Sequence, residues 1–177
     1  METPRVTPVT VILKTIVAHT VTYFLMGVLA FNVLDYTTLY AGQAVAGFLR
    51  PTSDPIVTAG PLVQPVRGLL FGVVFYWLRR PFFERRNGWL VLWATLVVIG
   101  ILSPFVAAPG SLEGVVYTTV PFSFHLISLP EVLLQTLLFS SLLYYWINHP
   151  GKRWLSWCLG IVFGLVLLLP ALGLLFG

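Results

Sequence analysis

An arginine inside an apolar stretch is the residue of this sequence that points most directly to chemistry. Arg67 lies in segment 61–78, which is rich in Leu, Val and Phe and also contains Gln64 one helical turn earlier. A guanidinium inside a bilayer costs about 2.5–3.5 kcal/mol on insertion scales unless it reaches the headgroups or finds a partner. Two interpretations follow: Arg67 snorkels toward the outer headgroups, or it belongs to a polar site between helices.

Further polar residues are expected at the depth of Arg67. Two lie at the start of apolar segment 129–147 and two at the end of segment 9–34. Polar groups in a bilayer usually face the bundle interior and mark a ligand or ion path. We therefore predict an outer pocket that binds an anionic ligand or lipid headgroup, and within it a charge pair between Arg67 and Glu131. The predicted ligand-binding residues are Arg67, Gln64, Glu131, Gln135, Asn32 and Asp35.

Glu131 also has a structural interpretation. Ser128, Leu129, Pro130 and Glu131 match a capping box, in which the carboxylate returns to free amides at the start of a helix. Capping and pairing with Arg67 are compatible, because a carboxylate has several acceptor sites. This pattern places the start of the fourth apolar helix near residue 129.

His19 lies in segment 9–34 and shares a helical face with Thr15, Thr22 and Met26. A proton relay needs a second titratable group at the same depth, and the other apolar segments offer none there. We therefore interpret His19 as a neutral histidine that hydrogen-bonds to a neighbouring helix. It is not expected to be essential for activity.

Enzymatic chemistry is weakly indicated. Glu113 and His125 can form an acid–base pair in an outer loop, with Ser111 or Ser128 as nucleophile, but this spacing is not diagnostic. The sequence contains no H-E-x-x-H pair, no G-x-S-x-G elbow and no phosphate-binding glycine loop. The single cysteine, Cys158, excludes an internal disulfide and a paired-cysteine metal site. We predict no catalytic residue, no metal and no cofactor.

The elements that position these residues follow from composition. Of the 177 residues, 58% are hydrophobic and 9% are charged, whereas soluble domains carry about 25% charged residues. The predicted fold is therefore an all-α, polytopic helical membrane protein that forms a single transmembrane domain over residues 1–177. Five spans are expected, at about 9–34, 61–78, 89–107, 129–147 and 154–176. Residues 35–55 suit a short extracytoplasmic helix that is interfacial or re-entrant.

The basic residues predict the orientation. Short loops rich in Lys and Arg stay on the cytoplasmic side of a membrane. With the N-terminus in the cytoplasm and the C-terminus outside, eight of the ten basic residues fall on the cytoplasmic side, and only Arg50 and Arg67 do not. The net charge of +4 thus reflects topology, and no nucleic acid is expected as a partner. The eight residues are Arg5, Lys14, Arg79, Arg80, Arg85, Arg86, Lys152 and Arg153.

Three classes of function remain for a protein of the cytoplasmic membrane. The favoured class is a small binding or transport module whose outer pocket holds an anionic ligand. The alternative is a structural or assembly subunit, which joins a partner membrane subunit or forms a homo-oligomer. An interfacial enzyme that modifies lipids is the least favoured class. Membrane lipids are expected partners in all three.

Small residues add one signal that bears on assembly. Gly68 with Gly72, and Gly160 with Gly164, have the spacing that lets two helices approach closely. We expect the first pair to pack its helix inside the bundle. The second pair lies in an otherwise featureless apolar segment, where it can contact another subunit.

The orientation can be tested by labelling single cysteines at positions 54, 85 and 113 in a Cys158→Ser background. An impermeant thiol reagent added to intact cells should label positions 54 and 113, because both are predicted to face outward, and should not label position 85. Position 85 is thus the internal control. The reverse pattern would overturn the predicted topology.

Overall fold

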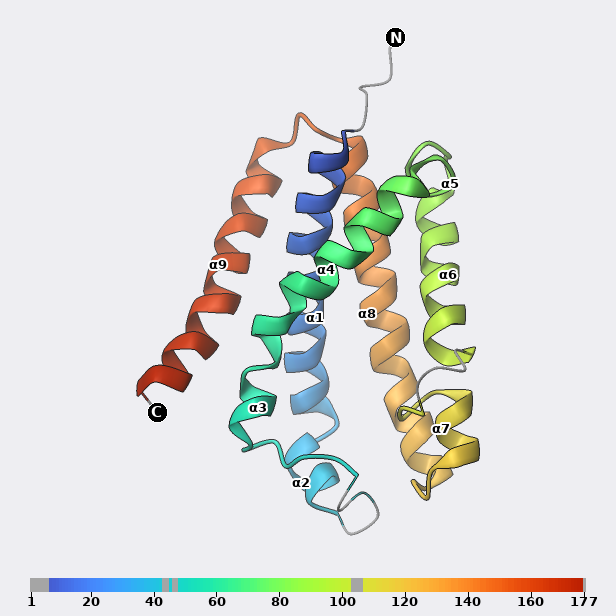
Figure 1. Ribbon diagram of the computed structural model, residues 1–177, viewed down its shortest axis with the longest axis vertical. Coiled ribbons are helices and arrows are strands. Elements are labelled where there is room, and N and C mark those ends of the chain that lie inside the picture. Colours follow the sequence, from blue (N-terminus) through green and yellow to red (C-terminus); the bar gives the residue numbers. More distant parts are fainter. Residues whose placement is uncertain (1–6, 43–44, 46–47, 103–106, 177) are drawn as a thin grey trace.

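A computed structural model describes residues 7–42, 45, 48–102 and 107–176 (Figure 1). This part of the chain is all-α, as the composition predicts, with four short helices joined to five longer ones. In chain order the helices are α1 (Pro8–Val33), α2 (Tyr36–Ala41), α3 (Pro55–Thr58), α4 (Gly60–Trp77), α5 (Arg79–Phe83), α6 (Gly88–Leu102), α7 (Leu112–Tyr117), α8 (Phe122–Asn148) and α9 (Arg153–Phe176).

Three of the described helices, α1, α8 and α9, are long and apolar enough to cross a membrane. The other two expected spans correspond to α4 and α6. α4 has 18 residues but is less apolar because it contains Gln64, Arg67 and two prolines, and α6 is an apolar helix of 15 residues. Residues 103–106 of the expected span 89–107 lie outside the described residues. The all-α membrane fold is thus confirmed, and five crossings remain a prediction.

Local sequence signals set several helix starts. The Thr7 hydroxyl accepts the Thr10 N–H at 3.3 Å, and Pro8 occupies the first turn of α1, where its missing N–H leaves no hydrogen bond unmade. Ser111 caps α7 in the same way. Asp35 adopts a positive φ of 45° and caps α2 through Thr38. Within the expected segment 35–55 the structure has the short helix α2, and α3 begins only at its last residue, Pro55. Residues 43–44 and 46–47 lie outside the described residues.

α8 begins at Phe122 rather than near residue 129, so the predicted capping box is wrong. The Ser128 hydroxyl donates to the Phe124 carbonyl within the helix at 2.9 Å, and Pro130 lies inside the helix. Phe124 and His125 are both buried in the first turn of α8, and consecutive residues of a helix can both face the interior. Burial of Phe124 and His125 thus favours a helix that begins before the predicted capping box at Ser128.

α1 is the central helix, and it packs against α4, α8 and α9. α4 crosses α1 obliquely (Figure 1), and the glycine pair lies at the crossing. A Cβ atom added at Gly68 would lie 2.7 Å from the Ile16 Cα, and one at Gly72 would lie 2.8 Å from the Ile12 Cα. The two backbones are therefore in direct contact, and the predicted packing role of this pair inside the bundle is confirmed.

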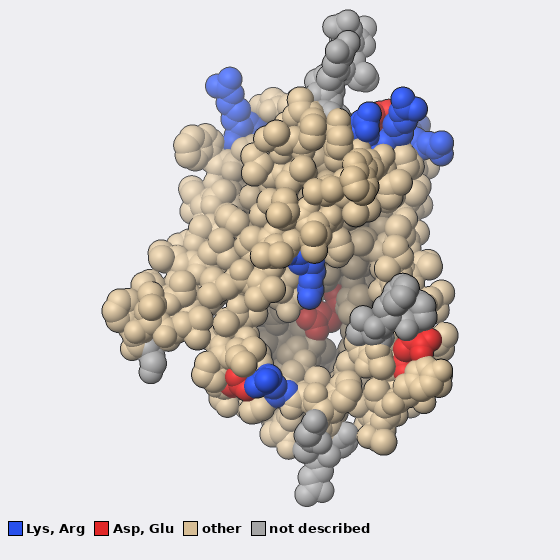
Figure 2. Space-filling model, viewed as in Figure 1, with Lys and Arg blue, Asp and Glu red and all other residues tan. Residues whose placement is uncertain are grey.

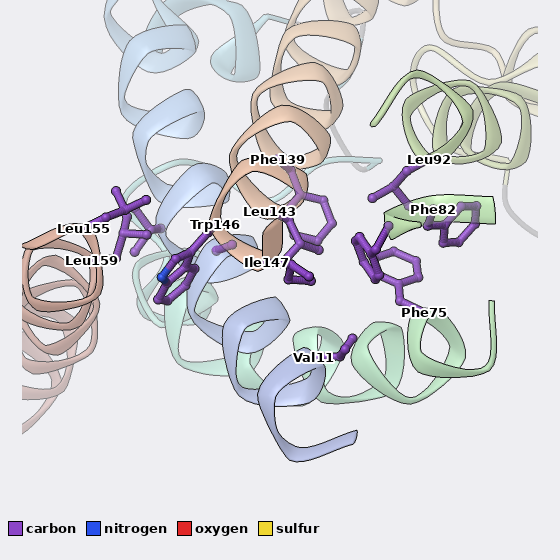
Figure 3. Close-up of a cluster of buried hydrophobic side chains, with 13 residues drawn as sticks. Val11, Phe75, Phe82, Leu92, Phe139, Leu143, Trp146, Ile147, Leu155 and Leu159 are labelled. Carbon is purple, nitrogen blue, oxygen red and sulfur yellow. The ribbon is translucent and has the colours of Figure 1, made fainter. Parts of the chain in front are cut away.

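The apolar core lies toward the end of the bundle that contains both α5 and the α8–α9 loop (Figure 1). Side chains from α1, α4, α5, α6, α8 and α9 interlock there (Figure 3). Leu92 and Leu143 are completely buried, and Phe139 is almost so. The core therefore packs six helices together at one end of the bundle. Its members include Val11, Phe75, Phe82, Leu92, Phe139, Leu143, Trp146, Ile147, Leu155 and Leu159.

Polar contacts close the same end. The Lys14 ammonium donates to the Trp146 carbonyl at 2.7 Å, near the C-terminus of α8, where the helix dipole favours a cation. The Tyr144 hydroxyl is within 3.0 Å of the Arg85 carbonyl and 3.1 Å of the Arg86 carbonyl. These bonds hold the loop between α5 and α6 against α8. Basic side chains gather at this end of the molecule (Figure 2).

The glycine contact predicts how substitutions act on stability. Gly68→Ala and Gly72→Ala should each destabilise the protein by about 1–3 kcal/mol, because the added methyl group meets backbone atoms that have no room to move. Gly160→Ala and Gly164→Ala are matched controls, since an added Cβ meets nothing within 4 Å at either position. Thermal unfolding of all four variants in one detergent tests this. Equal unfolding temperatures for both pairs would contradict the close contact.

Candidate functional site

Beside the apolar core, and sharing Phe75, Phe82 and Phe139 with it, lies a hollow between the helices that we call the central cavity, with a volume of about 480 Å³. Figure 2 shows this face of the molecule hollowed near its middle, with one basic and one acidic side chain beside the hollow. Each wall is a stripe of residues spaced three or four apart along one helix. The stripes include His19 and Tyr23 of α1, Arg67, Phe71 and Phe75 of α4, Leu96 and Ile99 of α6, and Glu131, Gln135 and Phe139 of α8.

Three of the predicted site residues, Arg67, Glu131 and Gln135, line this cavity. Arg67 and Glu131 do not form the expected ion pair. Among the described residues, the ion pair that the structure contains joins Arg50 to Asp54 at 2.8 Å. Equal depth in two helices does not make side chains meet, since each must also point toward the other. The Arg67 side chain, which is exposed, therefore lines a largely apolar cavity without a carboxylate bound to it.

Glu131 is bound by a residue of α2 instead. The Tyr36 hydroxyl donates a hydrogen bond to Oε2 of Glu131, and the Tyr36 ring stacks on Tyr40 with 4.9 Å between the ring centroids. Burial, reinforced by the hydrogen bond to Glu131, raises the pKa of the Tyr36 phenol. Tyr36 therefore stays protonated at physiological pH and donates to the carboxylate.

A second hollow, which we call the outer cavity, lies beside the first and has a volume of about 350 Å³. Tyr23 and Glu131 line both cavities, so the two are adjacent and share a wall. Five aromatic side chains line the outer cavity, and among its described lining residues Glu131 is the one that carries a charge. The remaining lining residues include Phe24, Phe31, Tyr36, Tyr40, Thr52 and Thr58.

His19 belongs to the site, although the sequence analysis left it out. The side chain is 3% exposed and lines the central cavity. Its ring centroid lies 5.1 Å from that of Phe71 and 5.2 Å from that of Phe139. Neither ring nitrogen has a hydrogen bond of standard geometry among the described residues, but the Gln64 side chain of the neighbouring helix α4 lies close enough to interact with the ring. The helical face shared with Thr15, Thr22 and Met26 was the available signal, and all four residues are buried.

Gln64 lies on α4 one helical turn before Gly68, next to the contact between α4 and α1. It is 3% exposed, its amide nitrogen donates to the Gly60 carbonyl at 3.2 Å, and its Oε1 has no partner among the described residues. Both Gln64 and Arg67 lie close to His19, Gln64 near enough for a side-chain hydrogen-bond interaction with the imidazole and Arg67 near enough for its charge to act on the ring. Buried polar groups are nearly always hydrogen-bonded, so His19 and Gln64 offer unused hydrogen-bonding capacity beside Arg67.

The other two predicted site residues lie elsewhere. Asn32 is exposed and donates to the Val28 carbonyl of its own helix at 2.7 Å. Asp35 caps α2 and lines a separate surface hollow with Thr38 and Phe124. Both were grouped with Arg67 on depth alone, and the structure does not bring either residue into the central or the outer cavity.

The residues considered for catalysis mainly bind backbone. The Ser111 hydroxyl donates to the Ala108 carbonyl at 2.7 Å and accepts the Gly114 N–H at 2.9 Å. His125 Nδ1 accepts the Gly110 N–H at 3.1 Å. Within the described ranges Glu113 forms no ion pair with His125, and no group of three or more His, Cys, Asp or Glu side chains can hold a metal ion.

Comparison with known proteins adds no functional information: no family model, curated protein or solved structure matches this chain. The function is therefore inferred from the chemistry of the two cavities. They combine a basic side chain without a bound carboxylate, buried polar atoms without partners, a carboxylate held by a tyrosine, and walls that are otherwise apolar or aromatic.

The contacts of Glu131 predict which substitutions depend on one another. A double-mutant cycle of Tyr36→Phe and Glu131→Gln should give a coupling energy above about 0.5 kcal/mol, because Tyr36→Phe removes the donor of this hydrogen bond and Glu131→Gln removes the charge of its acceptor. Arg67→Leu and Glu131→Gln should be additive within about 0.5 kcal/mol, since the two side chains are not bonded. Thermal or denaturant unfolding in one detergent measures both cycles. A larger coupling for Arg67 with Glu131 would indicate a direct pair instead.

Proposed function

We propose that this protein is a small binding module, with transport as an extension of the same role, that holds an amphipathic anionic ligand in the central cavity. The observation that carries this proposal is the Arg67 guanidinium, which faces a cavity of about 480 Å³ without an ion-pair partner among the described residues. A phosphate or carboxylate group of the ligand binds Arg67. The apolar part of the ligand lies against the walls that Phe71, Phe75 and Phe139 form.

The energetics favour an anion at this position. An arginine inside a membrane is costly unless a partner or water compensates its charge, and guanidinium groups match phosphate and carboxylate through two parallel hydrogen bonds. His19 and Gln64 lie beside Arg67 with polar atoms that have no partner in the described part of the chain. A bound headgroup would offer hydrogen-bond partners to these groups.

The membrane setting supports a ligand that comes from lipid. In the proposed orientation, the protein crosses the cytoplasmic membrane several times, with its N-terminus in the cytoplasm and its C-terminus outside. The gathering of basic side chains at one end of the molecule supports this arrangement (Figure 2). Arg67, 12 residues before Arg79, then lies about 18 Å from the cytoplasmic edge at the rise of an α-helix, in the outer leaflet.

A role as an assembly subunit is the second candidate, and the outer face of α9 favours it. Gly160 and Gly164 lie on this helix with nothing within 4 Å of an added Cβ, so the surface is open to a close helix contact. In this role α9 meets another membrane subunit or a second copy of the chain. Native mass spectrometry of gently solubilised protein distinguishes the candidates, since an assembly subunit retains protein and a binding module retains lipid.

The ligand proposal predicts a specific effect of Arg67. Phosphatidylglycerol should bind the purified protein at least tenfold more tightly than diacylglycerol with the same acyl chains, because only the phospholipid offers a phosphate to Arg67. Arg67→Gln should abolish this preference. Arg50→Gln is the control, since Arg50 is bound to Asp54 and lines neither cavity.

Titration with each lipid in native mass spectrometry measures the two affinities. Equal binding of the two lipids by the unmodified protein would refute the anion site. Retention of the preference in Arg67→Gln would refute the role of this arginine.

A further inference from the structure

The outer cavity has the composition of a site for an ammonium group. The rings of Tyr23, Phe24, Phe31, Tyr36 and Tyr40 line it together with the Glu131 carboxylate. Cations bind the faces of aromatic rings, and clusters of such rings recognise quaternary ammonium groups. No Lys or Arg belongs to its described lining, so a bound ammonium meets no repulsion from the wall.

The Tyr36–Glu131 contact holds the carboxylate at the boundary of the two cavities. The Tyr36 hydroxyl donates to Oε2 of Glu131, which leaves the other carboxylate oxygen and the remaining acceptor capacity for a ligand. The stacking of Tyr36 on Tyr40 positions two of the rings that face the cavity. Burial raises the pKa of both phenols, so neither ring carries a charge that competes with Glu131.

The two cavities together present opposite charges on either side of a shared wall. Arg67 lines the central cavity, Glu131 lines both cavities, and the two side chains do not neutralise each other by an ion pair. A ligand with an anion and a cation separated by a short linker satisfies both groups at once. A purely anionic headgroup satisfies Arg67 but places its negative charge near Glu131.

We propose that the ligand is a zwitterionic phospholipid, whose phosphate binds Arg67 and whose ammonium group occupies the outer cavity against Glu131 and the tyrosine rings. This inference rests on the proposed function: it keeps an anionic phosphate on Arg67 and adds a cationic group to the same ligand. In phosphatidylethanolamine and phosphatidylcholine, an ethylene link joins the phosphate to the ammonium group, so the two binding positions must be adjacent. The shared residues Tyr23 and Glu131 meet this requirement. The acyl chains extend along the apolar wall of the central cavity.

The test compares headgroups on identical acyl chains. The purified full-length protein is titrated with phosphatidylethanolamine, phosphatidylcholine and phosphatidylglycerol, and dissociation constants are measured by native mass spectrometry. Both zwitterionic lipids should bind at least tenfold more tightly than phosphatidylglycerol. Glu131→Gln should bring the three affinities within about threefold of one another, because it removes the charge that selects the ammonium group while retaining the size of the side chain. A tenfold difference corresponds to about 1.4 kcal/mol.

Two further variants separate the ammonium site from general effects on folding. Glu113→Gln removes a carboxylate of α7 that lines neither cavity, and it should keep the preference for zwitterionic lipids. Tyr40→Leu removes an aromatic ring from the outer cavity and should weaken phosphatidylcholine binding more than phosphatidylglycerol binding. Thermal unfolding of each variant identifies any that fails to fold, and the headgroup comparison on the unmodified protein needs no variant.

The outcomes distinguish the two proposals. If phosphatidylglycerol binds as tightly as the zwitterionic lipids and Arg67→Gln weakens it, the ammonium site is wrong and the anion site stands. If no phospholipid binds better than diacylglycerol, both proposals fail. If Glu131→Gln folds and keeps the full preference for zwitterionic lipids, Glu131 is not the ammonium partner and the inference is overturned.

Discussion

The contact between the backbones of α1 and α4 determines where the polar groups of this protein lie. Gly68 and Gly72 place α4 directly on Ile16 and Ile12 of α1. Gln64 belongs to the same i, i+4 stripe as the glycines, so it is buried at the crossing. The next stripe of α4 begins at Arg67 and continues through Phe71 and Phe75, and this stripe forms a wall of the central cavity. A bulkier residue at either glycine would separate the helices and move Arg67 away from His19.

The bundle is packed differently along its length. Side chains from six helices pack together at the end near α5 and the α8–α9 loop (Figure 3). The central cavity begins beside this core, at Phe75, Phe82 and Phe139, and the outer cavity lies farther along, where α2 and α3 contribute to its lining. Protein interiors normally contain few voids larger than a water molecule, and buried polar atoms normally have partners. Cavities of this size, with buried polar atoms left over beside an arginine, are the combination found where a ligand binds.

Part of the candidate site was predictable from local sequence. Arg67, Glu131 and Gln135 stand out because polar residues are rare in apolar segments, and all three line the central cavity. Asn32 and Asp35 met the same criterion of depth but lie outside both cavities, because depth does not specify direction around a helix. His19 was set aside for want of a titratable partner, yet the packing of α4 and α8 on α1 brings it into the wall. Tyr36 was not predicted at all, since the return of α2 toward α8 is a tertiary feature.

The sequence by itself determined the class of this protein, because a chain with 58% hydrophobic and 9% charged residues cannot expose its surface to water. Local sequence also determined the N-caps Thr7 and Ser111 and the close packing of the helix that contains Gly68 and Gly72, since capping and small-residue packing depend on side chains a few positions apart. That α1 is the partner of this helix was decided by the tertiary structure. Only the tertiary structure decided that Glu131 bonds to Tyr36, 95 residues away in the chain. Such a partnership depends on how the helices rotate and cross, which is set by the packing of the whole bundle and not by any one segment.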